Sequence, residues 1–225
     1  QIADARIQAQ KESPLWQNWL TSTSLRATGR TKQGNPVVIY AHVPNYFTNP
    51  KNITKAIKQG LVNYAGKLPK EEFQRLIDLQ DNKSVFVVDH NTLKNSNSGV
   101  IATKNALKHP QTIPFLGGEE RAEQYVKAHE KVYGKSIGLW HTDDLSDTPL
   151  GRLLFAGNYC NYGLDGFNCL GGIACFVGVR RGESAEGALK NFSGPTLDQL
   201  LKLSEEFVPV IGKAKFIERI NAFYQ

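Results

Sequence analysis

The sequence predicts an α/β fold: a mixed parallel and antiparallel sheet with helices packed on it, with an α+β arrangement as a close alternative. Apolar runs over residues 36–43, 84–89 and 136–140 predict strands, and amphipathic helical patterns lie between them. This alternation is typical of a sheet covered by helices, whereas a predicted hairpin near the N-terminus argues against an all-parallel sheet. No internal repeat or linker divides the chain, so we expect one globular domain over residues 1–225.

The N-terminal half is predicted as follows. Residues 1–12 are polar and have no apolar face, so a flexible arm or frayed helix is expected there. Ser13-Pro14 predicts the start of a short helix, because proline fits the first helical position. Two extended runs around the turn residues 31–35 predict a β-hairpin. Helices beginning at Asn49-Pro50 and at Pro69 each place apolar residues on one face.

The second half continues the alternation. Its predicted elements are a strand at 84–89, a polar loop at 91–99, a short helix at 102–108, an edge strand at 113–116, a helix from Gly118 to Gly134 and a strand at 136–140. Residues 152–156 and 173–180 are predicted to pair as antiparallel strands. Two amphipathic helices near 196–207 and 212–224, separated by Pro209, form a predicted C-terminal helical pair.

The composition limits the class of protein. Of the 225 residues 40% are hydrophobic, which is enough for a substantial core, and no apolar stretch approaches the length of a membrane span. The net charge of +6 and the basic pI of about 9.2 give a weak preference for acidic partners. Nucleic acid is disfavoured, because the basic residues are not clustered among aromatic ones. The chain starts at Gln1 and contains no methionine, from which a processed N-terminus is expected.

Three predicted strands end at a histidine. The candidate catalytic residues at these ends are His42, Asp89, His90, His141, Asp143 and Asp144. If the strands were parallel neighbours, their carboxyl ends would bring imidazole and carboxylate groups together. Such a group could perform acid–base chemistry or hold a divalent metal ion. No dense ligand spacing supports a metal, so no metal ligand is assigned and the cofactor is unknown.

The segment 157–172 is a long loop rich in glycine, asparagine and aromatic residues. Its candidate ligand-binding residues are Tyr159, Tyr162, Asp165, Phe167 and Asn168, a mixture of stacking and hydrogen-bonding groups that suits a sugar ring or a protein partner. Cys160 and Cys169 flank this loop and are a candidate disulfide in an oxidising compartment.

Two functional hypotheses follow. In the first, the chain is a ligand- or protein-binding protein of the periplasm or the cell exterior that uses the aromatic loop. In the second, it is a hydrolase, with or without a metal ion, whose His/Asp site lies at the strand ends. The binding hypothesis is preferred because no catalytic group has a diagnostic spacing. The sequence does not decide whether the protein is an enzyme. A cytoplasmic location is the alternative if the cysteines are reduced.

Overall fold

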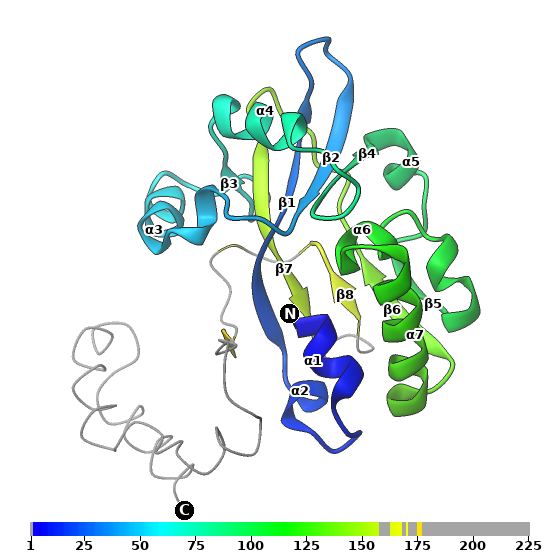
Figure 1. The fold of residues 1–225 in the computed structure, drawn as a ribbon. Coiled ribbons are helices and arrows are strands. Elements are labelled where there is room, and N and C mark those ends of the chain that lie inside the picture. The colour runs from blue at the N-terminus through cyan, green and yellow to red at the C-terminus, as the bar shows by residue number, and fades with distance from the viewer. Residues whose placement is uncertain (1, 158–162, 168–169, 171–174, 177–225) are drawn as a thin grey trace, which may run out of the picture. The chain divides into compact units, whose positions relative to one another are not determined.

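The computed structural model describes residues 2–157, 163–167 and 170, and the backbone of residues 175–176 (Figure 1). The chain divides into two units, residues 1–178 and residues 179–225, and the second lies outside the described residues. Several predictions also fall outside them: Tyr159, Cys160, Tyr162, Asn168, Cys169 and the two C-terminal helices. For these residues, and for the single domain, the predictions stay predictions.

The described residues form a mixed sheet flanked by helices, as the sequence predicted (Figure 1). Its strands are β1 (Leu20–Arg30), β2 (Pro36–Ala41), β3 (Gly66–Lys67), β4 (Val85–Asp89), β5 (Gly99–Ala102), β6 (Ser136–Trp140), β7 (Leu150–Ala156), β8 (Leu164–Asp165) and β9 (Cys175–Phe176). The spatial order is β4-β2-β1-β7-β8-β6-β5, with β3 paired to β7 and β9 paired to β1. Within the described part of the chain, the β6–β8 and β1–β9 pairs are parallel and the others are antiparallel.

Helices cover both faces of the sheet. The α-helices are α1 (Ile2–Gln8), α2 (Pro14–Gln17), α3 (Pro50–Lys58), α4 (Lys70–Asp78), α5 (His90–Lys94), α6 (Thr112–Leu116) and α7 (Glu119–Tyr133), and the 3-10 helices are η1 (Tyr46–Thr48) and η2 (Thr103–Lys108). Two of these starts have a clear local reason: the side chains of Ser13 and Asn49 accept hydrogen bonds at the first turns of α2 and α3, which both begin at a proline.

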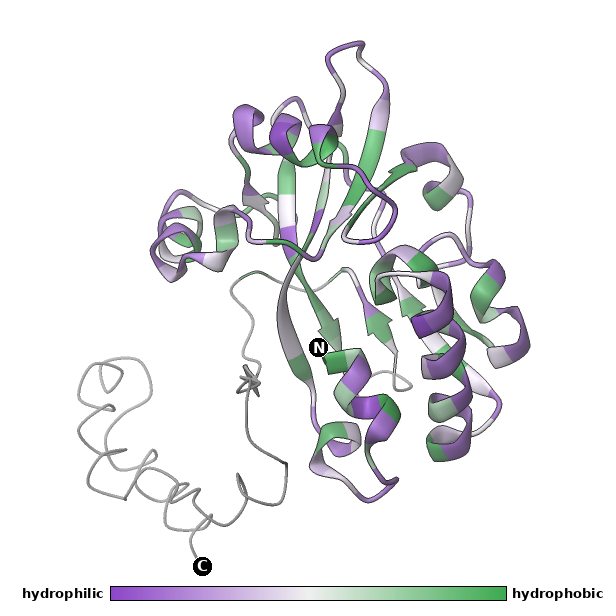
Figure 2. Ribbon diagram, in the orientation of Figure 1, coloured by the Kyte–Doolittle hydropathy of each residue, from purple (hydrophilic) through white to green (hydrophobic). Residues whose placement is uncertain are grey.

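The sheet separates two hydrophobic cores. Val38 and Tyr40 of β2 pack on one face against α7 and its neighbours, while Val37, Ile39 and Ala41 pack on the other face with Phe47 and α4. This alternation explains why β2 reads as a continuous apolar run: both of its faces are covered. Figure 2 shows the hydrophobic segments concentrated along the strands and on the inward sides of the helices.

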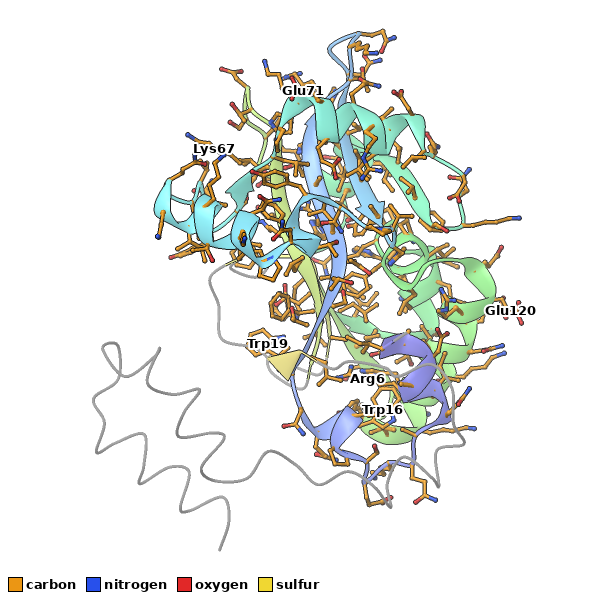
Figure 3. All side chains as sticks on the ribbon, turned by 60° about the vertical axis from the view of Figure 1, so that its left-hand side comes forward. Arg6, Trp16, Trp19, Lys67, Glu71 and Glu120 are labelled. Carbon is orange, nitrogen blue, oxygen red and sulfur yellow. The ribbon has the colours of Figure 1, made fainter. Side chains whose placement is uncertain are left out.

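Residues 2–8 form the helix α1, so of the two forms expected for residues 1–12 the flexible arm is wrong and a helix is present. Arg6 of this helix is fully buried, lies 5.2 Å from the ring centre of Trp16, and donates to the hydroxyl of Tyr125 (2.8 Å) and to the carbonyls of Leu15 (2.8 Å) and Ala156 (3.0 Å) (Figure 3). Because these partners belong to separate elements, Arg6 ties the N-terminus to the body of the protein. The spacing of apolar residues does not reveal this anchor, since the buried residue is charged.

Two further predictions need correction. Residues 113–116 lie in the helix α6, not in an edge strand, because Pro114 falls in the first turn, where a helix does not need its N–H. The second concerns the antiparallel pair predicted for 152–156 and 173–180. In the described residues, β7 pairs with β1, β3 and β8, whereas β9 pairs in parallel with β1.

Candidate functional site

The strand directions decide which of the predicted site residues meet. β2 is antiparallel to β4, so His42 and His90, which follow these strands, lie at opposite ends of the pair. β4, β8 and β6 run in the same direction, as the chain of pairings through β2, β1 and β7 requires. The assumption of three parallel neighbours was therefore wrong. His90 and His141 lie at one end of the sheet, and His42 lies at the other.

His42 is a structural residue at its end of the sheet. Its Nε2 donates to the carbonyl of Pro114 (2.8 Å), because a carbonyl can only accept, and its Nδ1 accepts from the hydroxyl of Ser24 (2.9 Å). Burial lowers the pKa of His42, and the positive charge of Arg121 acts in the same direction. The neutral imidazole thus joins β1 and α6 across the end of β2.

The other strand-end residues gather around the segment 141–144. His90 donates from Nε2 to the carbonyl of Asp143 (3.1 Å), whose carboxylate lies 3.9 Å from the ammonium of Lys94. Asp144 pairs with the guanidinium of Arg152 and accepts from Asn63 Nδ2 (3.2 Å). Four of the six predicted residues, His90, His141, Asp143 and Asp144, are therefore brought together.

Asp89 has a different role. Its carboxylate accepts from the backbone N–H and the hydroxyl of Thr92 (2.7 and 3.0 Å), so it caps the first turn of α5. These hydrogen bonds lower the pKa of this exposed carboxyl. A capping carboxylate is already committed to the helix, which explains why β4 ends in an aspartate.

His141 is held in one protonation state. Ser96 donates its hydroxyl to the carbonyl of Leu93 (2.6 Å), so its oxygen accepts from Nε2 of His141 (3.1 Å). The ring centre of His109 lies 5.6 Å from that of His141. Burial, the positive charge of Arg26 and the neighbouring His109 lower the pKa of His141 to about 4. A neutral histidine in this position supports the loop around it.

Within the described ranges, no group of three or more His, Cys, Asp and Glu side chains could hold a metal ion. In addition, His42, His90 and His141 each donate their Nε2 proton to a fixed acceptor. The geometry therefore gives these histidines the task of positioning loops.

A cavity of about 350 Å³ opens beside this cluster. It is lined by eight residues from α5 and the loop after it, from the end of β6 and from the aromatic loop: Lys94, Ser96, Ser98, Trp140, His141, Thr142, Asp143 and Phe167. We call these eight residues the Phe167 face. The two regions that the sequence singled out, the strand ends and the 157–172 loop, thus meet at one surface.

The described part of the aromatic loop is anchored through its backbone. Gly166 N donates to the carbonyl of Trp140 (2.8 Å), and Phe167 N donates to the carboxylate of Asp165 (2.7 Å). Asp165, predicted to bind ligand, therefore supports the turn that carries Phe167. The side chain of Phe167 is 47% exposed, which leaves an aromatic ring available at the surface.

Two buried arginines beneath this face were missed by the sequence analysis. Arg152 of β7 is 2% exposed and donates to the carbonyls of Asn63 (2.5 Å) and Phe167 (3.2 Å), with its guanidinium carbon 5.6 Å from the Phe167 ring centre. Arg26, its cross-strand neighbour in β1, donates to the carbonyl of Thr142 (2.6 Å). The available signal was a single arginine in the middle of each otherwise apolar or small-residue strand.

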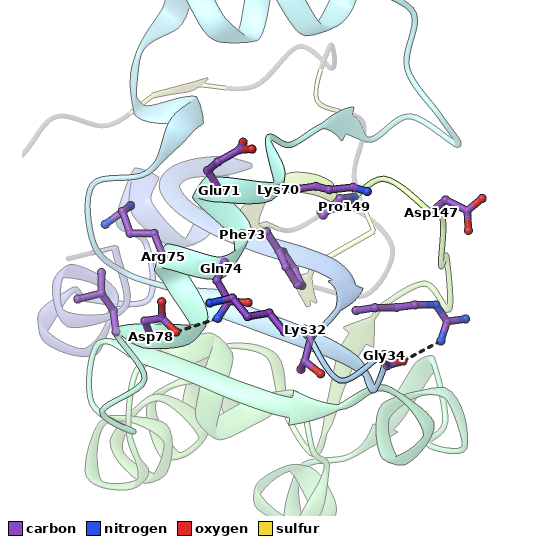
Figure 4. A pocket seen from close by; sticks show the side chains of 13 residues that line it. Lys32, Gly34, Lys70, Glu71, Phe73, Gln74, Arg75, Asp78, Asp147 and Pro149 are labelled. Atoms are coloured by element: carbon purple, nitrogen blue, oxygen red, sulfur yellow. Dashed lines mark hydrogen bonds between the residues drawn. The ribbon is translucent and has the colours of Figure 1, made fainter.

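A second, larger cavity of about 780 Å³ lies between the tip of the β1–β2 hairpin and α4 (Figure 4). Phe73 lies in its floor, and charged side chains of both signs surround it, among them Arg30, Lys70, Glu71 and Asp147. None of the predicted site residues lines this cavity.

A solved structure resembles this chain over most of its length. The two chains are 60% identical, with a TM-score of 0.76, and the match covers 80% of this chain and 84% of that one. That structure is described by the words "Accommodation of massive sequence variation in Nanoarchaeota by the C-type lectin fold". No family model and no curated protein match the chain.

At this identity and coverage, the chain belongs to the same family of proteins with the C-type lectin fold. This fold is α+β with a mixed sheet and is a fold that binds ligands and proteins. The predicted mixed sheet with packed helices is thereby confirmed. No helix among the described residues has both the length and the apolar character needed to cross a membrane.

Proposed function

We propose that this chain is a binding protein that holds its ligand or protein partner at the Phe167 face, with the rest of the 157–172 loop contributing further contacts. An exposed aromatic ring beside a small polar cavity is a typical recognition surface, because the ring gives apolar contact area and the cavity gives directed hydrogen bonds. The exposed charges of Lys94 and Asp143 stand at its edge.

The observation that carries this proposal is how the loops are held. The anchoring side chains donate to backbone carbonyls of the loop residues: Arg152 to Asn63 and Phe167, Arg26 to Thr142, His90 to Asp143, Ser98 to His141, and Gln111 to Trp140 and Leu164. Every residue type has a backbone carbonyl. Exposed loop side chains can therefore change without removing the bonds that position the loop.

This arrangement suits a fold that is described as accommodating massive sequence variation in a protein of the same family. We infer that the exposed positions of the Phe167 face in this chain accept many residue types, and that the residues present set the ligand. The same proposal extends to Tyr159, Tyr162 and Asn168 as ligand contacts.

A library test separates this proposal from a purely structural role. Lys94, Asp143 and Phe167 are randomised together, and in a matched library the buried anchors Arg26, Gln111 and Arg152 are randomised. We expect most members of the first library to fold, since exposed substitutions usually change stability by at most about 0.5 kcal/mol, and most members of the second to unfold. Equal loss of folded protein in the two libraries would contradict the proposal.

Binding is tested on the unaltered chain with a glycan array and a protein array. Replacement of Phe167, Lys94 and Asp143 by alanine is expected to abolish binding to the array members that the unaltered chain binds, while the melting temperature stays close to its original value. Unchanged array binding by this triple variant would contradict a binding role for the Phe167 face.

An extracytoplasmic location, periplasmic or secreted, is proposed as well. It rests on the spacing of Cys160 and Cys169 around the aromatic loop, which suits a disulfide. Thiol counting on protein purified without reductant tests it: one free thiol of three supports the pairing, and three free thiols contradict it. No observation in the described residues favours the hydrolase hypothesis, because the strand-end histidines are committed to structural hydrogen bonds.

A further inference from the structure

The tight turn between Val62 and Ala65 has an unusual backbone. The two residues exchange backbone hydrogen bonds of 2.9 and 2.8 Å, and the residues between them, Asn63 and Tyr64, have φ angles of +47° and +68°. This left-handed region favours glycine and asparagine and is uncommon for an aromatic residue. Tyr64 is also 62% exposed, so packing of its ring does not explain why a tyrosine stands there.

Buried groups hold this turn in place. The carbonyl of Asn63 accepts from Arg152 (2.5 Å), its side-chain amide donates to Asp144 (3.2 Å), and the carbonyl of Tyr64 accepts from Leu170 N (3.0 Å). A strained position that the surrounding structure enforces, with its side chain directed to solvent, is the kind of site where strain serves function.

The chain around the turn is strongly basic. Residues 49–70 contain five lysines and no aspartate or glutamate. All five are exposed, and none forms an ion pair with another described residue: Lys51, Lys55, Lys58, Lys67 and Lys70. Three of them follow at i, i+4 and i+7 along α3, so they share one side of that helix, and Ile57 of the same helix is 44% exposed. Lys70 lines the second cavity beside Glu71, so we call the other four lysines, Ile57 and Tyr64 the basic surface.

We infer that the basic surface binds an acidic segment of a protein partner, with Tyr64 as its aromatic contact residue. Unpaired lysines attract carboxylates and steer an acidic partner toward the surface. A tyrosine on a rigid turn supplies amphipathic contact area at a small entropic cost, because its backbone is already fixed. A protein partner is favoured over nucleic acid because the surface contains no arginine and only one aromatic side chain.

This inference rests on the proposed function and adds to it that the partner carries an acidic segment. Arg152 connects the two surfaces, since the same guanidinium binds the carbonyls of Asn63 and Phe167. A partner that spans both surfaces would meet an aromatic ring on each side of this buried arginine. The two surfaces can nevertheless be tested separately, because their exposed side chains are different.

The test uses the full chain as target for a phage-displayed library of random peptides, with the dominant peptide then synthesised with a fluorescent label for anisotropy. We expect acidic peptides to be enriched. Tyr64→Gly is the decisive variant: glycine fits the left-handed backbone, so the melting temperature is expected to stay equal or rise, while affinity for the peptide falls about tenfold or more. Asn82→Gly is the matched control, because Asn82 is another exposed residue with a positive φ (54°), and its affinity should not change.

The charge is tested in the same way. Lys55→Glu with Lys58→Glu should abolish peptide binding, whereas Lys104→Glu with Lys108→Glu, an equal charge change on η2, should leave most of it. Enrichment of peptides without acidic residues, or wild-type affinity in Tyr64→Gly, would overturn the inference. The inference would also be overturned if the lysine substitutions weakened binding of single-stranded DNA or of phosphatidylglycerol vesicles but left binding of the peptide unchanged.

Failure of this inference is distinguishable from failure of the proposed function. If the acidic peptide loses affinity in Phe167→Ala and keeps it in Tyr64→Gly, the basic surface is not its site and the Phe167 face still is. If it loses affinity in Tyr64→Gly alone, the basic surface binds independently of that face.

Discussion

Replacing Arg152 with methionine removes the side chain on which three segments of the chain converge. The guanidinium is 2% exposed, pairs with the carboxylate of Asp144, and donates to the backbone carbonyls of Asn63 and Phe167. Methionine fills part of the same volume but leaves Asp144 without its cationic partner in a site where that side chain is only 12% exposed. Removing one partner of a buried ion pair costs about 3–5 kcal/mol, because the remaining charge stays desolvated.

The hydrogen bonds to the two carbonyls point to the same magnitude. Hydrogen bonds that involve a charged group contribute roughly 1.5–3 kcal/mol each, and buried acceptors left without a donor add a desolvation cost. Apolar contacts of the methionine offset part of this loss. We therefore expect the free energy of unfolding to fall by about 3–5 kcal/mol in Arg152→Met.

Urea unfolding followed by tryptophan fluorescence measures this change. All three tryptophans, Trp16, Trp19 and Trp140, lie in the described residues, so the signal reports on the sheet and its helices. Arg30→Met is the control, because Arg30 is exposed and its hydrogen bond within the described residues goes to the nearby carbonyl of Gly34 (3.1 Å). This variant should change stability by at most about 0.5 kcal/mol. The double variant with Asp144→Asn should cost less than the sum of the single variants, since the two groups form one pair. A loss below about 1 kcal/mol in Arg152→Met would refute the argument that this arginine anchors the site.

Three other perturbations test separate parts of the structure. Gly163→Ala should lower the melting temperature strongly, because an added Cβ would lie 2.2 Å from the backbone oxygen of Gly138. Overpacking of this kind costs roughly 1–3 kcal/mol or more. A melting temperature equal to that of the unaltered protein would contradict the close approach of β6 and β8. The pKa of His141 is about 4 in the folded protein, below its unfolded value, so the unfolded state binds more protons between the two values. Stability should therefore fall as the pH drops from about 6.5 to about 4, by at most about 3 kcal/mol from this residue. His141→Gln should flatten that part of a urea-unfolding pH profile, and an unchanged slope would show that other groups cause it. Arg6→Met should destabilise the protein by about 2–4 kcal/mol in the same urea assay, because Arg6 serves acceptors in three separate segments; a value near zero would restore the picture of a flexible arm.

The strands and most helices could be predicted because their signals are local. β2 and β4 are apolar runs bounded by turn residues, and α7 begins at glutamates and ends at Gly134, as the helix dipole and the C-terminal glycine preference require. The misassignment at 113–116 is also local in origin. Pro114 argues against a central strand, but a proline followed by Gly117 equally suits a short helix that ends in a left-handed residue, here with φ of +78°.

The site could be predicted only in part, because its assembly depends on strand direction. Whether His42 joins His90 depends on whether β2 and β4 are parallel, and that is set by the hairpin and by the long-range pairing of β4 with β2. His90 does reach the segment that follows β6, through its hydrogen bond to the carbonyl of Asp143, because β4 and β6 point the same way. In the sheet order, β2, β1, β7 and β8 lie between these two strands. Residue types at strand ends are visible in a sequence, but the direction of each strand within the sheet is not.

Buried arginines are the part of the site that the sequence pattern does not reveal, and they also position the loops of the surface. Arg6, Arg26 and Arg152 occupy positions where a hydrophobicity pattern expects apolar residues, and each donates to backbone carbonyls of distant segments. An apolar residue there would bury area equally well but could not fix the position of a loop, since loops position themselves by satisfying their backbone groups. The arrangement separates two tasks: buried arginines set where the loops lie, and exposed side chains such as Phe167 and Tyr64 set what the loops contact. If this separation holds, substitutions at the arginines should lower the free energy of unfolding, and substitutions at the aromatic residues should lower binding affinity. Substitutions at the aromatic residues should change stability only slightly.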